Sequence, residues 1–167
     1  MLNNINKKQP DLSNYYYIKL IIILFILSRI LYYFAGLKME VYLDAWQFFP
    51  DEFLKNDLLK STFFSFSQPP LFNIFTGFTL KLSNYISNGS YNYYVVFWRY
   101  TFLIFGLLSS IGLYRLCDLL FLNKKKSFYI TLIFMVLPTT LLFENHGYKD
   151  YLTFCFLILL IYLSINI

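Results

Sequence analysis

The densest group of side chains with chemical potential lies between residues 144 and 150. Glu144, His146, Lys149 and Asp150 occur within this stretch, and His146 is the only histidine of the chain. Carboxylates and an imidazole can hold a divalent metal ion, and a lysine can bind a phosphate. The spacing matches no metal motif such as HExxH, so a plain exposed turn explains it equally well. A divalent metal ion is the one candidate cofactor.

Asp44 is a second candidate, because it follows an apolar segment closely in the sequence Val-Tyr-Leu-Asp-Ala-Trp. A carboxylate at a membrane surface is partly desolvated, which raises its basicity. Such a group can deprotonate an acceptor or hold a cation. A solvated loop aspartate is the alternative interpretation.

Two arginines lie near the ends of long apolar runs, where a buried positive charge needs a partner. Arg29 is embedded in the first run, and Arg99 stands between Trp98 and Tyr100 at the beginning of the second. Ionisable residues within a membrane are functional candidates. The alternatives are that Arg29 extends to the interface and that Arg99 is an interfacial anchor.

These residues must be positioned by membrane helices, because the composition leaves too little polar surface for a soluble domain. Hydrophobic residues make up 58% of the 167 positions and charged residues only 14%,. Long apolar runs predict four spans, each near the length that crosses a bilayer. The expected spans are 16–35, 94–113, 128–143 and 151–167.

The fold class expected from these runs is all-α, a polytopic membrane helix bundle. Pro138 should kink the third span. A polar N-terminus covers residues 1–15, and the largest loop covers residues 36–93. Within that loop we expect an interfacial helix that begins at Pro50, and a short re-entrant or interfacial helix over residues 71–82, followed by a polar turn.

The distribution of basic residues predicts the orientation. The basic residues near the span ends on one side are Lys7, Lys8, Lys19, Arg115, Lys124, Lys125 and Lys126. Because cytoplasmic loops carry excess lysine and arginine, that side should be cytoplasmic. We therefore expect an integral protein of the bacterial inner membrane with a cytoplasmic N-terminus. The net charge of +5 is scattered between apolar runs, which argues against a nucleic-acid partner,.

The order of these features resembles the start of membrane glycosyltransferases with the GT-C fold, which include the aminoarabinose and protein O-mannosyl transferases. The matching sequence of features begins with Arg29 late in the first helix and an acidic residue, Asp44, opening the outer loop. It continues with a proline-rich return at Gln68-Pro69-Pro70-Leu71, an arginine at Trp98-Arg99-Tyr100 and the stretch from Glu144 to Asp150. A complete member has many more spans, so this chain would be an N-terminal portion that needs a further C-terminal part or a partner subunit.

The resemblance implies transfer of a sugar from a polyprenyl-phosphate donor to an acceptor on the extracytoplasmic side, with a membrane lipid as partner. Asp44 would be the catalytic base. Arg99, Gln68 and Lys149 would bind substrate or phosphate, and Glu144, Asp150 and His146 would hold a metal or the acceptor. Two alternatives stay open: a fragment of a polysaccharide polymerase, and a non-enzymatic membrane subunit or transporter fragment.

Overall fold

The computed structural model describes residues 12–36, 57, 59–60, 70–87, 91–145 and 149–165. All the regular secondary structure in this part of the chain is helical, which confirms the all-α expectation. The helices are α1 (Leu12–Phe34), α5 (Pro70–Ser87), α6 (Tyr91–Phe121), α7 (Lys124–Val136), α8 (Pro138–Asn145) and α9 (Lys149–Ile165). The interfacial helix expected at Pro50 lies outside the described residues.

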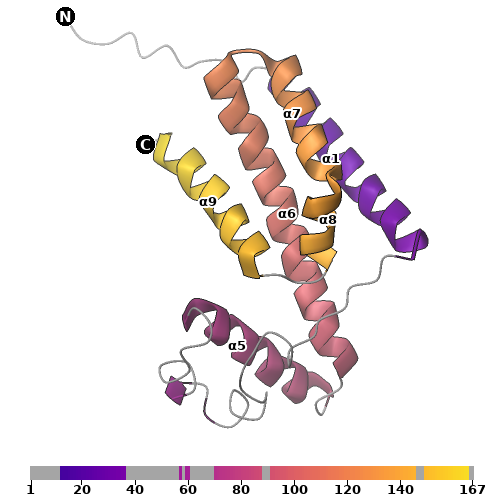
Figure 1. Cartoon of the computed structure of the whole chain (residues 1–167), viewed down its shortest axis with the longest axis vertical. Helices are drawn as coiled ribbons and strands as arrows, with labels where there is room; N and C mark the ends of the chain where they lie inside the picture. The colour runs from indigo at the N-terminus through magenta and orange to yellow at the C-terminus, as the bar shows by residue number, and fades with distance from the viewer. Residues whose placement is uncertain are drawn as a thin grey trace, which may run out of the picture.

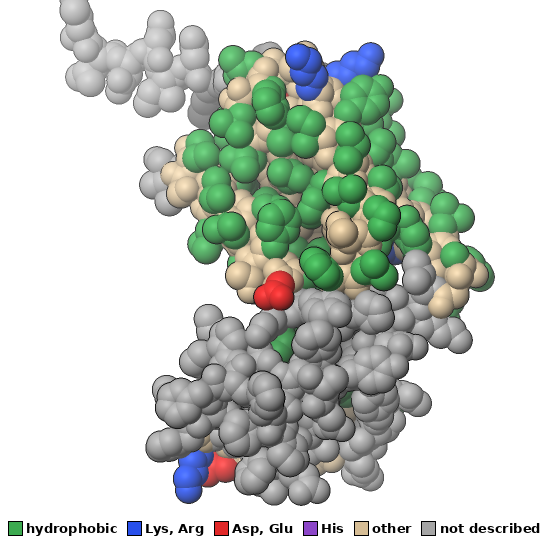
Figure 2. All heavy atoms as spheres, in the orientation of Figure 1, with side chains coloured by type: hydrophobic (Ala, Val, Ile, Leu, Met, Phe, Trp, Pro, Cys, Tyr) green, Lys and Arg blue, Asp and Glu red, His purple; other side chains and the backbone are tan. Residues whose placement is uncertain are grey.

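Two helices are long and apolar enough to cross a membrane, in the segments Tyr15–Phe34 and Tyr93–Phe121. A third crossing is formed if α7 and α8 are one broken span. The expected fourth span corresponds to α9, whose 17 residues fall short of the roughly 20 that a straight crossing requires,. Apolar side chains cover most of the visible face of these helices (Figure 2). The protein is therefore a helical membrane protein by the length and composition of its helices.

The long helix α6 is the centre of the bundle, with α7 and α9 packed along it and α1 beside α7 (Figure 1). One buried cluster joins α1, α6 and α7 around Phe25, Tyr114 and Met135. A second joins α5, α6 and α9 around Trp98 and Tyr151. Because helices in a membrane gain little from hydrophobic burial, close packing and buried polar contacts must hold these clusters together.

The break between α7 and α8 confirms the kink expected at Pro138. The two helices meet at an angle of 55°. Proline has no backbone N–H and its ring collides with the preceding turn, so the helical hydrogen-bond ladder cannot continue through it. The backbone of Leu137 leaves the helical region, and α8 then starts at Pro138. This bend directs α8 back against α6 and α9.

Helix α5 lies apart from the other helices, against the beginning of α6 (Figure 1). It runs to Ser87, five residues past the expected end at residue 82, so the expected polar turn is in part helical. Its buried residues include Asn73, Thr76 and Ser83, whereas Phe78, Tyr85 and Lys81 are exposed. Polar and apolar side chains therefore lie on both sides of α5.

Trp98 fixes α5 to α6. Its indole Nε1 donates a hydrogen bond to Thr79 Oγ1 at 3.1 Å, and its ring packs against Phe72, Phe75 and Phe102. The side chain is only 1% exposed. Tyr100, two residues further along α6, lies on the other side of the helix, and its side chain is 62% exposed.

We predict that Trp98→Ala lowers the free energy of unfolding by about 3–5 kcal/mol, because it removes a large buried ring and leaves a cavity. Thermal unfolding in a non-ionic detergent measures the change, and limited proteolysis should cut the chain near α5 first. Tyr100→Ala is the matched control and should cost less than about 1 kcal/mol. Equal effects of the two substitutions would contradict the role given to Trp98.

Candidate functional site

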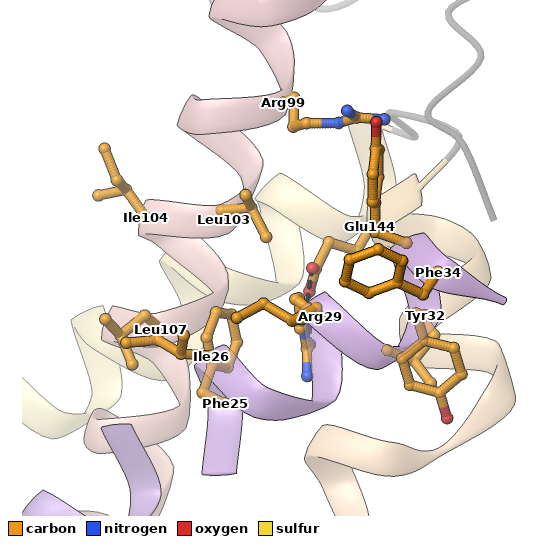
Figure 3. Close-up of a pocket in the computed structure, with 13 residues that line it drawn as sticks. Phe25, Ile26, Arg29, Tyr32, Phe34, Arg99, Leu103, Ile104, Leu107 and Glu144 are labelled. Atoms are coloured by element: carbon orange, nitrogen blue, oxygen red, sulfur yellow. Dashed lines mark hydrogen bonds and ion pairs between the residues drawn. The ribbon is translucent and has the colours of Figure 1, made fainter. Parts of the chain in front are cut away.

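Arg29 and Glu144 form a buried ion pair between α1 and α8. The guanidinium donates from Nε to Glu144 Oε1 at 3.0 Å and from Nη2 to Oε2 at 2.6 Å. The two side chains are only 11% and 8% exposed. Two parallel hydrogen bonds give this arrangement both strength and a fixed orientation. The pair joins residues 115 positions apart in the sequence and ties the first helix to the kinked one (Figure 3).

The third nitrogen of the Arg29 guanidinium makes a hydrogen bond at the break between α7 and α8. Its Nη1 donates to the backbone carbonyl of Met135 at 3.0 Å and to Ser28 Oγ at 2.9 Å. Met135 lies in the last turn of α7, where carbonyl groups lack helical partners and carry the negative end of the helix dipole. The guanidinium carbon also lies 3.9 Å from the centroid of the Phe25 ring. Arg29 therefore stabilises the kink as well as pairing with Glu144.

Tyr151 supplies a third hydrogen bond to the Glu144 carboxylate. Its hydroxyl donates to Oε2 at 2.8 Å from the first turns of α9. Gly106 of α6 faces this group: a Cβ atom there would lie 2.5 Å from the Tyr151 hydroxyl and 3.1 Å from Glu144 Oε2. The glycine lets α6 approach the polar cluster closely, as small residues do between membrane helices. Four helices thus converge on Glu144.

A pocket of about 450 Å³ opens beside this cluster. Its lining is almost entirely apolar, and its charged members are Arg29, Arg99 and Glu144. The walls come from the last three turns of α1, the first half of α6 and α8 (Figure 3). Phe34, the last residue of α1, lines the pocket, so α1 ends at its rim. Pockets of this size and composition hold small amphiphilic ligands.

Arg99 contributes the second positive charge among the described residues of this pocket. Its guanidinium carbon lies 5.6 Å from the centroid of the Tyr33 ring, at the long end of a cation–π contact,. Among the described residues, the one ion pair at this site is that of Arg29 with Glu144, so no described carboxylate neutralises Arg99. The pocket therefore carries two positive groups and one negative group, and an anion would balance the difference.

The structure brings together some of the residues expected from the sequence. Arg29, Arg99 and Glu144 line one pocket. Asp150 is exposed in the first turn of α9, and the side chain of Lys149 lies outside the described part of the chain. Asp44, Gln68 and His146 also lie outside it, so their roles stay predictions. The described residues contain no group of three potential metal ligands, and the metal assignment of Glu144 and Asp150 likewise stays a prediction.

The contacts made by Tyr151 and Gly106 could not be predicted from the sequence. A tyrosine at the start of an apolar run and a glycine within another are common in membrane helices. Their importance follows only from the approach of α9 and α6 to Glu144. The one available signal was Glu144 itself, a carboxylate next to an apolar segment, which requires donors if it is buried.

We predict that Glu144→Gln destabilises the bundle by about 3–5 kcal/mol, because it leaves the buried guanidinium of Arg29 without a counterion. Thermal unfolding in detergent measures the effect. Asp150→Asn, which changes an exposed carboxylate six residues away, should alter stability by less than about 0.5 kcal/mol. A fully stable Glu144→Gln protein would contradict the structural role of the ion pair.

Gly106→Ala should destabilise the protein by about 1–3 kcal/mol, since the new methyl group overlaps the Tyr151 hydroxyl. Gly112→Ala is the matched control, because its Cβ would meet only side-chain methyl groups, Leu159 Cδ2 at 3.2 Å and Ile158 Cγ2 at 3.4 Å. Combining Gly106→Ala with Tyr151→Phe removes the colliding hydroxyl and should recover part of the loss. If Tyr151→Phe does not lessen the effect in the same unfolding assay, the close approach is misassigned.

No model of a known protein family matches this chain, and no curated protein or solved structure matches it either. A function must therefore be inferred from the pocket, its charges and the order of features along the chain.

Proposed function

We propose that the pocket binds the phosphate of a lipid carrier, and that the chain is the N-terminal part of a membrane glycosyltransferase of the GT-C type. The observation that carries this proposal is the Arg99 guanidinium at the edge of an apolar pocket, without a carboxylate partner among the described residues. An arginine in that setting favours a bound anion with an apolar tail. The resemblance along the chain supplies the reaction.

The chemistry of the pocket suits a polyprenyl phosphate. Arginine binds phosphate oxygens through parallel hydrogen bonds, and its charge is permanent. The aliphatic and aromatic lining, including Ile26, Ile30 and Ile104, offers an apolar surface to the first isoprene units. Its volume of about 450 Å³ holds a phosphate with a few such units rather than a whole lipid,. The rest of the tail would lie among the lipids.

The reaction would be displacement at the anomeric carbon of the donor sugar. The acceptor hydroxyl oxygen forms the new bond to that carbon as the bond from the carbon to the phosphate oxygen breaks, with inversion. Asp44 takes the proton of the hydroxyl, and polyprenyl phosphate leaves with the bonding electron pair. Arg99 balances the charge that develops on the leaving phosphate. Gln68 and Lys149 would contact the substrate, and His146 and Asp150 would hold the acceptor or a metal ion.

Glu144 takes a positioning role in this proposal. Its carboxylate already accepts two hydrogen bonds from Arg29 and one from Tyr151. These bonds hold α1 and α8 as the walls of the pocket and neutralise Arg29. Arg99 is then the positive group left for the donor phosphate.

One observation favours a second candidate, a non-enzymatic membrane subunit or a transporter fragment. Broken helices and buried ion pairs mark the pathways of many transporters, and the kink at Pro138 next to Glu144 combines both. In that case Arg29 and Glu144 would exchange partners during transport, and no sugar would be transferred.

The proposal predicts that the purified chain in a mild detergent binds farnesyl phosphate more tightly than farnesol. Arg99→Gln should reduce the affinity for the phosphate by about 10- to 100-fold and leave that for farnesol unchanged, because it removes one charge-assisted contact. Isothermal titration calorimetry measures both ligands. Lys81→Gln, which removes an exposed positive charge from α5, is the control and should bind like the wild type.

Equal binding of farnesol and farnesyl phosphate, or an unchanged Arg99→Gln protein, would contradict the phosphate site. Phosphate binding without sugar transfer, measured in cells that supply the complete protein, would instead favour the non-enzymatic candidate.

A further inference from the structure

The turn between α6 and α7 gathers positive charge from three helices. Lys124, Lys125 and Lys126 form the first turn of α7, and Arg115 lies in the last two turns of α6. Lys19 of α1 reaches the same end, because its neighbour Tyr17 packs against Phe128 of α7 at 5.4 Å between ring centroids. In the described part of the chain, Asp118 is the acidic residue at this end. Basic side chains are visible at the end of the molecule where α7 begins (Figure 2).

Exposed apolar side chains flank this charge. Leu120, Phe121 and Leu122 are 65%, 53% and 87% exposed. Leu122 sits at the tip of the turn with a φ of 51°, a left-handed conformation that costs a leucine free energy and that a glycine adopts easily,. In water, the exposed apolar side chain of Leu122 does not compensate for its strained backbone. Its exposure is favourable if the tip meets the apolar part of a lipid interface.

The turn is well fixed by its own hydrogen bonds. The Leu122 N–H donates to the Asp118 carbonyl at 3.0 Å, which closes α6. Asn123 caps α7, since its side chain accepts from the Lys126 N–H at 3.0 Å and its carbonyl accepts from Ser127 Oγ at 2.9 Å. The backbone donor that the cap uses is therefore already satisfied, and the side chains of Lys125 and Lys126 are exposed beside it. Nothing in the helix itself favours three lysines there, because they lie at the positive end of its dipole.

We propose that this turn is a binding surface for anionic phospholipids, defined by Leu122 and the three lysines of α7. The exposed side chains of Lys125 and Lys126 contact the phosphates of the headgroups, while Leu122 and Phe121 enter the layer between headgroups and acyl chains. Combined basic and apolar contacts of this kind distinguish a lipid surface from a free phosphate, which would gain nothing from Leu122. The surface lies at the end of the bundle opposite Arg29 and Arg99 and is independent of the proposed sugar transfer.

The test measures lipid affinity with the whole chain in a non-ionic detergent, using soluble short-chain phosphatidylglycerol and phosphatidylcholine and counting bound lipids by native mass spectrometry. Wild-type protein should prefer phosphatidylglycerol by about tenfold or more, and added salt should reduce the preference. The double variant Lys125→Gln, Lys126→Gln should lose it. The matched control, Lys60→Gln with Lys81→Gln, changes exposed lysines elsewhere and should keep it.

Leu122→Gly separates the apolar contact from the charge. It relieves the positive φ, so the protein should be at least as stable as the wild type in detergent, while the affinity for both lipids falls and the preference for phosphatidylglycerol remains. The proposal is overturned if the wild type binds both lipids equally, if the control lysines matter as much as those of α7, or if inorganic phosphate displaces phosphatidylglycerol as well as the lipid itself does.

Discussion

A guanidinium and a carboxylate buried in an apolar bundle must satisfy one another, because lipid offers neither of them a partner. Arg29 and Glu144 do so through two hydrogen bonds, and each also holds a further helix. Arg29 binds the Met135 carbonyl at the end of α7, and Glu144 accepts from Tyr151 of α9. The kink at Pro138 turns α8 back against α6 and α9. Arg29 contacts both sides of this bend, through the Met135 carbonyl of α7 and the Glu144 carboxylate of α8.

The same contact shapes the pocket and determines its charge. With Arg29 neutralised by Glu144, the positive charge of Arg99 has no described counterpart at the pocket. An apolar cavity with one such charge suits an amphiphilic anion, and α1 ends at its rim. The opposite end of the bundle carries the lysines of α7. The anionic ligands that we propose for the two ends are bound differently. Arg99 is a single charge at a pocket, whereas the lysines form a basic surface beside exposed leucines.

Much of the helical architecture could be predicted from apolar runs and from Pro138, because span length and the missing N–H of proline are local properties. Arg29 and Arg99 could be singled out for the same reason. The partner of Arg29 could not, since the contact joins positions 115 residues apart and arises only when α8 turns back. An exposed turn was one of the two interpretations left open for residues 144–150, and Glu144 is buried instead. The polar residues buried on α5 were also missed, because the sequence does not reveal which side of a helix meets the protein.

The most direct test is a double-mutant cycle on Arg29 and Glu144. The free energy of unfolding is measured in detergent for the wild type, Arg29→Gln, Glu144→Gln and the double variant. If the ion pair holds the bundle, the double variant loses less stability than the sum of the two single changes, and the coupling energy is about 2–3 kcal/mol in favour of the pair. A coupling energy near zero would mean that the two charges act independently, and it would contradict the central place given to this contact.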